Sequence, residues 1–179
     1  MTAKSSPKAY GSIAVSLHWI TVVLITLLLA TGMIADDAND VGRKATILSF
    51  HAPFGITVLL VTLVRLVWWW RFDTKPKPLG GDPAWQETLA KAVHILLYVV
   101  ILGMAASGIG MFVLSGAGDI LFGGAPGSLP DFDKFAPRVP HGIGAKILLV
   151  LIVGHVGAAL FHHFVKRDGI LGRMWFARR

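Results

Sequence analysis

The stretch that decides the fold is residues 141–155, HGIGAKILLVLIVGH, an apolar run with a histidine at each end. At about 1.5 Å and 100° per residue, fourteen steps along an α-helix make nearly four turns. Both imidazoles therefore leave roughly the same helix face, about 21 Å apart along the axis. This separation suits two stacked sites better than one shared site.

The composition indicates a membrane protein. Hydrophobic residues make up 54% of the 179 residues and charged residues only 15%, which is more apolar than a soluble domain. There is no cysteine, so disulfides, iron–sulfur clusters and covalently attached c-type haem are excluded. Any cofactor must be held by histidine, methionine or oxygen ligands. The net charge of +7 is interpreted as marking cytoplasmic helix ends, with no nucleic acid as partner.

Four apolar runs are each long enough to cross about 30 Å of hydrocarbon. They are residues 12–35, 45–70, 90–114 and 141–165. We predict an all-α membrane protein, a four-transmembrane-helix bundle that forms a single membrane domain over residues 1–179. Residues 1–11 are predicted to be a mobile tail and residues 166–179 a basic tail. A cleaved signal peptide is the alternative for the first run, but the run is longer than a usual signal h-region.

The positions of the cations predict the orientation of the bundle. Of the 17 lysines and arginines, five lie at the first and third connectors and twelve on the opposite side, with both termini. Because lysine and arginine accumulate on the cytoplasmic side, both termini are predicted to be cytoplasmic. Trp68, Trp69 and Trp70, beside Arg71, are typical of an interfacial anchor on that side.

Histidines within the predicted spans fall at two depths. His18 and His94 lie near the cytoplasmic ends of the first and third spans, and His155 lies in the same half of the fourth. His51 and His141 lie near the outer ends of the second and fourth spans. A single intramembrane histidine is often only hydrogen-bonded to a neighbouring helix, but two at one depth can bind a haem iron from both sides. A zinc site would need three or four ligands at one point, which the two depths do not favour.

The spacing leaves two questions open on the cytoplasmic side. Either His155 or His94 can lie opposite His18. Arg65 follows His51 by fourteen positions, so it shares that face and reaches the cytoplasmic depth. There it either pairs with a haem propionate or extends toward the lipid headgroups.

Five features together resemble the prokaryotic cytochrome b561 family, which is related to the b-type cytochrome subunits of nickel–iron hydrogenases and formate dehydrogenases. They are SLHW at 16–19, HAPFG at 51–55, LAKAVHILLY at 89–98, the pair His141 and His155, and FHHFVKRDGILGRMW at 161–175. The resemblance implies a four-helix bundle with two b haems. It also implies that His18 and His155 bind the iron of the cytoplasmic-side haem, and that His51 and His141 bind the iron of the outer one.

The resemblance further implies electron transfer across a bacterial inner membrane, within a respiratory chain, from an outer periplasmic donor to a membrane quinone. The stand-alone members suggest a superoxide:ubiquinone oxidoreductase, with superoxide as donor and ubiquinone as acceptor. The alternative is a membrane-anchor cytochrome b subunit that passes electrons from a docked dehydrogenase or hydrogenase-like redox protein to quinone. A haem-free transporter is a third hypothesis, supported by the intramembrane histidines themselves.

Further polar residues are candidates for the two ends of such a path. His94, His162 and Lys91 lie where a quinone or its protons would arrive on the cytoplasmic side. Lys134, Arg138 and Lys146 are shared by the third connector and the last span. They could form a local cationic patch that attracts an anionic donor near His141.

Overall fold

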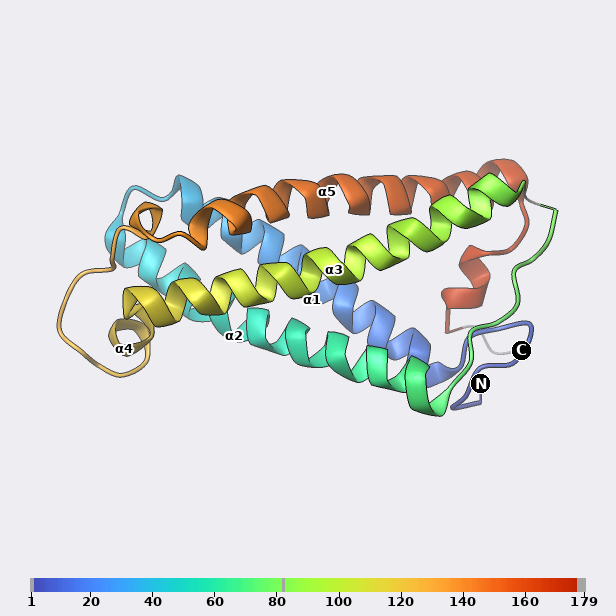
Figure 1. Cartoon of the computed structure of the whole chain (residues 1–179), viewed down its shortest axis with the longest axis horizontal. Coiled ribbons are helices and arrows are strands. Elements are labelled where there is room, and N and C mark those ends of the chain that lie inside the picture. Colours follow the sequence, from blue (N-terminus) through green and yellow to red (C-terminus); the bar gives the residue numbers. More distant parts are fainter. Residues whose placement is uncertain (1, 82, 177–179) are drawn as a thin grey trace.

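The computed structural model describes residues 2–81 and 83–176, which form helices and no strand (Figure 1). The four long helices are α1 (Ser12–Asp37), α2 (Val41–Val67), α3 (Ala84–Ser115) and α5 (Arg138–Phe161). The short elements are the π-turns η1 (Trp68–Phe72) and η3 (His162–Lys166), helix α4 (Ala117–Leu121), and the 3-10 turns η2 (Phe132–Lys134) and η4 (Leu171–Met174). With η1 and η3 continuing α2 and α5, all four helices are long and apolar enough to cross a membrane. The all-α, four-span prediction is confirmed.

The helices extend beyond the predicted apolar runs, because polar residues of the connectors continue the helical backbone. Helix α3 begins at Ala84, ahead of the apolar run predicted to start at residue 90. Helix α2 begins after Asp40, whose side chain accepts a hydrogen bond from the Arg43 amide as an N-cap. Gly116, with φ of 68°, ends α3 in the left-handed conformation that glycine adopts without strain, and α4 follows at once.

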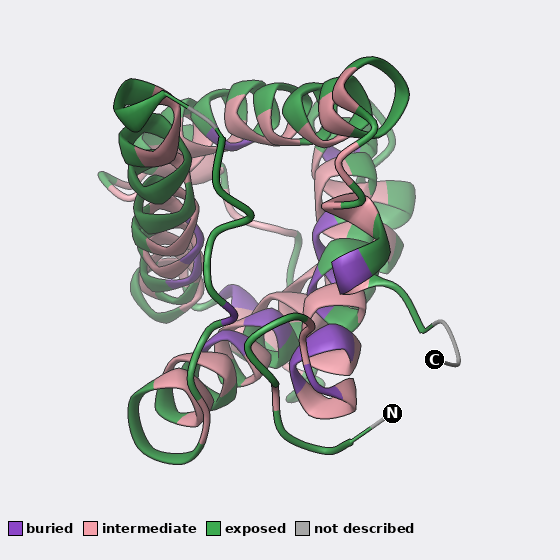
Figure 2. Cartoon of the chain, turned by 90° about the vertical axis from the view of Figure 1, so that its right-hand side faces the viewer, coloured by how far each residue is buried: buried purple, intermediate pink, exposed green. Residues whose placement is uncertain are grey.

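The bundle consists of two helix pairs, α1 with α2 and α3 with α5. Seen end-on, the four helices surround a common axis, and exposed residues cover their outward faces (Figure 2). Large apolar side chains are among them, including Val150 at 71% and Val153 at 64% exposure. In a soluble protein such surfaces would be costly, whereas here they form the face that the membrane covers.

An apolar layer crosses the middle of the bundle. Its buried residues are Leu24, Ile25, Val58, Ile101 and Leu148, so each long helix contributes at least one. Each lies about half-way along its helix between the two depths at which the histidines occur. The packed layer therefore separates the two groups of histidines with side chains that carry no hydrogen-bonding group.

The two ends of the bundle differ. Residues 2–11, the α2–α3 connector and residues 167–176 gather at one end, here called the terminal end (Figure 1). Helix α4 and the connector that precedes α5 lie at the opposite end, here called the far end. That the terminal end faces the cytoplasm stays a prediction. Arg178 and Arg179 of the predicted basic tail lie outside the described residues.

The prediction of a mobile N-terminal tail is wrong for the segment around Ser5 and Lys8. The Asp73 carboxylate accepts hydrogen bonds from the Ser5 amide at 3.0 Å and the Ser5 hydroxyl at 2.7 Å. Buried Arg173 donates from Nε to the Lys8 carbonyl and from Nη2 to the Lys77 carbonyl. Three segments far apart in sequence thus form one cap over the terminal end, and sequence patterns do not reveal such contacts.

The tryptophan triplet belongs partly to this cap. The Trp68 indole donates to Asp73, and Trp69 packs edge-on against Tyr10 with ring centres 5.9 Å apart. Trp70, 84% exposed, is the member of the triplet that faces outward as an interfacial anchor does.

Candidate functional site

The far-end pair consists of His51 from α2 and His141 from α5. Their ring centres are 6.3 Å apart, and both side chains are half-buried. They face each other across the bundle from helices that belong to different helix pairs.

A hydroxyl from α1 fixes the protonation of the His51 ring. Thr31 Oγ1 lies 2.9 Å from His51 Nδ1 and 2.7 Å from the Leu27 carbonyl. A hydroxyl has one hydrogen to donate, and Thr31 donates it to the Leu27 carbonyl, so its oxygen accepts from the ring. His51 therefore carries its proton on Nδ1, and the lone pair for a metal is on Nε2.

The same arrangement recurs beside His141. Ser107 Oγ of α3 donates to the Met104 carbonyl at 3.0 Å and lies 3.0 Å from His141 Nδ1. The ring nitrogen is also 3.1 Å from the Met104 carbonyl, a second acceptor. Both histidines of the far-end pair are thus held as Nδ1–H donors with Nε2 available.

Two glycines make room for these rings. A Cβ added at Gly32 would lie 3.3 Å from Cε1 of His51, and one added at Gly108 would lie 3.3 Å from Cε1 of His141. Any larger side chain at either position would press on the ring. Each glycine directly follows the hydroxyl residue that binds the same histidine.

The terminal-end pair consists of His18 from α1 and His155 from α5, with ring centres 6.4 Å apart. His94 of α3 lies on the other side of His155, edge-on at 5.2 Å, and its Nδ1 is 2.6 Å from the Ala90 carbonyl. Of the two candidates to lie opposite His18, His155 is the one whose ring contacts the His18 ring. His94 contacts His155 instead.

Arg65 turns into the bundle, not toward the headgroups. Its Nη2 lies 3.3 Å from His18 Nδ1, and its guanidinium carbon lies 5.6 Å from the centre of the Tyr98 ring. Its Nε is buried without a hydrogen-bond partner. Within the described part of the chain no carboxylate pairs with it. A buried guanidinium with an unused donor is suited to an anionic group.

The ring separations fit one metal ion bound between two imidazoles. With metal–nitrogen bonds of about 2 Å and roughly 1.1 Å from each nitrogen to its ring centre, the ring centres would be about 6.2 Å apart. The observed separations are 6.3 and 6.4 Å. Across residues 2–81 and 83–176, no three His, Cys, Asp or Glu side chains gather as a bare metal ion would require. The geometry favours a metal that brings its own equatorial ligands, as haem iron does.

The candidate relay residues lie at the terminal end. His162 Nδ1 is hydrogen-bonded to the Asp168 carboxylate, which leaves Nε2 for another partner. Partial burial acts to raise the pKa of Asp168, but hydrogen bonds from His162 and the Ile170 amide outweigh it and lower that pKa below its usual range. Lys91 is exposed on the first part of α3.

The candidate cationic patch at the far end is largely neutralised. Arg138 forms ion pairs with Asp36 and, at 3.2 Å, with Asp133. Lys134 lies 3.7 Å from the Asp131 carboxylate. Of the three predicted cations Lys146 alone has no ion pair among the described residues. The attraction expected for an anion near His141 is therefore weaker than the sequence suggests.

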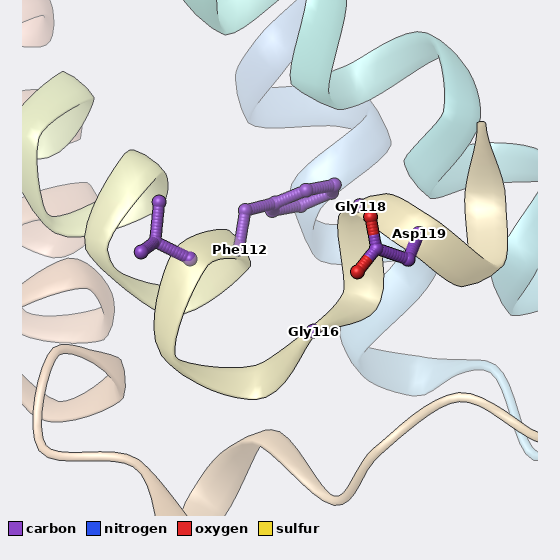
Figure 3. Close-up of a pocket in the computed structure, with 5 residues that line it drawn as sticks. Phe112, Gly116, Gly118 and Asp119 are labelled. Carbon is purple, nitrogen blue, oxygen red and sulfur yellow. The ribbon is translucent and has the colours of Figure 1, made fainter. Parts of the chain in front are cut away.

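A pocket of about 250 Å³ lies away from the histidines, where α3 meets α4 (Figure 3). It is lined by Phe112, Val113, Gly116, Gly118 and Asp119. Asp119 is its one ionisable side chain, and no imidazole reaches it. It offers no pair of ligands and is separate from both histidine pairs.

Thr31 and Ser107 are the candidate site residues that the sequence patterns did not identify. Thr31 follows His18 by thirteen positions, and Ser107 follows His94 by thirteen. In both cases glycine comes next. This repeated spacing of histidine, hydroxyl residue and glycine is the signal that would have revealed them, and it relates α1 to α3.

Four apolar helices that hold two stacked pairs of facing imidazoles define the class of the protein, an electron-transferring membrane cytochrome. The model of the family described as prokaryotic cytochrome b561 matches residues 9–177. The chain belongs to this family, and membership implies b-type haem in a multi-pass bacterial membrane protein.

Known relatives cover the chain almost end to end. Cytochrome b561 homolog 1 of Escherichia coli is 30% identical over 175 residues, 95% of this chain and 98% of the relative. Cytochrome b562 of Cereibacter sphaeroides is 26% identical over 170 residues, 92% of this chain and 94% of the relative. A probable superoxide oxidase, CybB of Yersinia pestis, is 24% identical over 175 residues, 96% of this chain and 98% of the relative.

Proposed function

We propose that the chain binds two b haems, one in each histidine pair, and carries electrons across the bacterial inner membrane from a donor at the far end to a quinone at the terminal end. The carrying observation is the pair of imidazole separations, 6.4 and 6.3 Å, both near the value for two ligands on one iron. The ligands are His18 with His155 and His51 with His141. The far end is proposed to face the periplasm.

At the far end the chain supplies ready ligands. Thr31 and Ser107 hold His51 and His141 as Nδ1–H tautomers, so each Nε2 lone pair is free for iron. Gly32 leaves room beside the His51 ring. Bound haem supplies one-electron chemistry at its iron, and two imidazole ligands leave no open position for dioxygen.

At the terminal end Arg65 would have a different partner once His18 holds iron. A guanidinium only donates, so its contact with His18 Nδ1 requires the proton of His18 on Nε2. With Nε2 of His18 holding iron, the ring proton would be on Nδ1, and Arg65 would donate to another acceptor. Haem carries anionic propionates, and we propose that Arg65 forms an ion pair with one of them.

Between the two pairs the chain keeps water out. Leu24, Val58, Ile101 and Leu148 fill the middle of the bundle without a polar side-chain atom. An electron can cross such a layer, whereas a proton needs a chain of hydrogen-bonding groups. The protons that a quinone takes up must therefore come from the terminal end.

His162 is the proposed proton donor to the quinone. The Asp168 carboxylate is hydrogen-bonded to its Nδ1, which orients the ring and leaves Nε2 to face the quinone. Lys91 and His94, both exposed on α3, are candidates to bring protons from water. Ubiquinone needs two electrons and two protons to become ubiquinol, so a redox path and a proton path must meet here.

Superoxide is the proposed donor, supported by the name of one relative, a probable superoxide oxidase. Each superoxide gives one electron and leaves as dioxygen, so two are used for each quinone. The neutralised cations around Arg138 favour a second candidate, an uncharged or protein donor docked at the far end. The electron path through the bundle is the same in both cases.

Stopped-flow mixing of the purified, haem-loaded chain with superoxide tests the proposal. Reduction of both haems, followed by reoxidation on adding a ubiquinone analogue, is the expected result. Haems that stay oxidised with superoxide but are reduced by dithionite and reoxidised by quinone would exclude superoxide as the donor. That result would support the second candidate, a donor docked at the far end. Failure of quinone to reoxidise them would remove the quinone acceptor.

A further inference from the structure

The two histidine pairs differ in what faces the nitrogen that does not bind metal. At the far end each ring donates its Nδ1–H to a hydroxyl, that of Thr31 at 2.9 Å or of Ser107 at 3.0 Å. Each hydroxyl donates its own hydrogen bond to a backbone carbonyl, so its oxygen is held as an acceptor for the ring. Both far-end ligands therefore have a fixed hydrogen-bond acceptor.

At the terminal end the described residues supply no such acceptor. In the described part of the chain the one hydrogen-bond partner of the His18 ring is Arg65, a cation that cannot accept. The His155 ring has no hydrogen-bond partner among the described residues, and its neighbour is the ring of His94. Neither terminal-end ligand is polarised by an oxygen acceptor.

The charges near the two levels differ in the same direction. Arg65 and Arg173 at the terminal end have no carboxylate partner among the described residues, and Arg173 is held by the Lys8 and Lys77 carbonyls. At the far end Arg138 is neutralised by Asp36 and Asp133. Whether Arg65 stays beside His18 or turns to a propionate, its positive charge stays at the terminal-end level.

Both differences change the reduction potentials so that an electron is more stable at the terminal-end site. A hydrogen bond accepted from Nδ1–H makes an imidazole a stronger electron donor, which stabilises oxidised iron and lowers its reduction potential. A nearby positive charge that no carboxylate side chain neutralises stabilises the added electron and raises the reduction potential, most strongly where the surroundings are apolar. The hydroxyls of Thr31 and Ser107 therefore lower the reduction potential of the far-end site. The charge of Arg65 raises the reduction potential of the terminal-end site.

We propose that Thr31, Ser107 and Arg65 set a potential difference between the two sites, so that an electron is more stable at the terminal-end pair and moves inward downhill. The proposal rests on the proposed function, because it requires one haem in each pair. We expect the electron to favour the terminal-end site at least tenfold, which is about 59 mV for a one-electron couple. These side chains would make the path directional, with no moving part.

Potentiometric titration of the purified, haem-loaded chain tests the proposal. His141→Ala keeps only the terminal-end haem and His155→Ala only the far-end haem, so each midpoint can be assigned. We expect the higher midpoint in His141→Ala. Equal midpoints, or the higher one in His155→Ala, would overturn the proposal. A wild-type chain with fewer than two haems would instead overturn the proposed function.

Variants at the hydroxyls separate tuning from folding. Thr31→Val and Ser107→Ala should each shift the lower midpoint to a more positive value and leave the higher one in place. Thr26→Val is the matched control, because Thr26 lies on the same helix, is exposed, and bonds only to the Val22 carbonyl. No shift in Thr31→Val, or an equal shift in Thr26→Val, would contradict the assignment.

Variants at Arg65 test the midpoint potential of the terminal-end site. Arg65→Gln should shift the higher midpoint to a more negative value, and Arg65→Lys, which keeps the charge, should restore most of it. A purely structural role predicts loss of haem in both variants with no selective shift. If Arg65→Gln binds no terminal-end haem, the Lys variant and the two hydroxyl variants still decide the proposal.

Discussion

The far-end and terminal-end pairs have nearly the same ring separation, 6.3 and 6.4 Å, but very different surroundings. Helix packing sets the separation, because each histidine pair joins α5 to a helix of the α1–α2 pair across the bundle. Side chains from a third helix set the surroundings: Ser107 beside His141 and His94 beside His155, both from α3. Under the proposed function, the residues that bind the cofactor and the residues that tune it are therefore different ones.

The largest effect, a change in haem content, should distinguish the two histidines that are candidates to complete the terminal-end pair. His155→Ala removes a proposed iron ligand and should reduce haem content from two per chain to one. His94→Ala removes only a neighbour of His155 and should keep both haems, with at most a shifted terminal-end midpoint. Pyridine haemochrome assays on purified protein measure both. Loss of a haem in His94→Ala with two haems retained in His155→Ala would reverse the ligand assignment.

The next effect concerns the room beside the far-end pair. Gly108→Val places a branched side chain where a Cβ alone would be 3.3 Å from the His141 ring. It should displace the ring and lower far-end haem occupancy by half or more, while the terminal-end haem stays bound. Gly103→Val on the same helix is the control, since a Cβ there meets nothing within 4 Å. Similar haem loss in both variants would mean that valine harms α3 in general.

A smaller effect should come from removing the two carboxylates that neutralise Arg138 near the far-end pair. Asp36→Asn combined with Asp133→Asn frees Arg138 and should raise the rate of haem reduction by superoxide roughly threefold at low ionic strength. Salt should reduce the gain, because exposed charges are screened within about 10 Å at 0.1 M. Asp119→Asn, at the same end but not bonded to Arg138, should give little gain. A gain independent of salt would argue against steering.

The smallest effect concerns the cap on the terminal-end side. Burial acts to raise the pKa of Asp73, but hydrogen bonds from the Ser5 hydroxyl and amide outweigh it and hold the pKa below its usual range. A lowered folded-state pKa stabilises the fold above the unfolded-state value of about 3.9, and this contribution is lost as pH falls through the folded-state pKa.

Asp73→Asn should therefore destabilise the chain by about 1 kcal/mol at neutral pH, a modest value because the site is partly exposed. The difference from wild type should shrink as pH falls below the unfolded-state pKa and vanish once the folded-state carboxylate is protonated. Thermal unfolding followed by tryptophan fluorescence measures it, with exposed Asp37→Asn as the control. An undiminished difference at low pH would show that the charge of Asp73 is not the cause.

The sequence predicts the four spans and the two depths of histidine because hydropathy and helical periodicity are local properties. It does not decide between His94 and His155, since both reach the same depth and only helix packing determines which ring lies opposite His18. It also leaves both roles of Arg65 open. The structure turns that side chain inward, which depends on Tyr98 and His18 from other helices.

Other features depend on contacts that no local pattern encodes. Thr31 and Ser107 look like ordinary membrane-helix hydroxyls, and their role follows from a ring on a neighbouring helix. The cap joins Ser5, Asp73 and Arg173, which are far apart in sequence. Neutralisation of Arg138 likewise depends on where α1 ends in space.

The most direct test of the central claim is the amount and ligation of haem in the purified wild-type chain. A pyridine haemochrome assay should give two b haems per chain, and electron paramagnetic resonance should show two low-spin ferric signals of bis-histidine type. One haem per chain, or a high-spin signal that accounts for half of the iron, would contradict the assignment of one haem to each histidine pair.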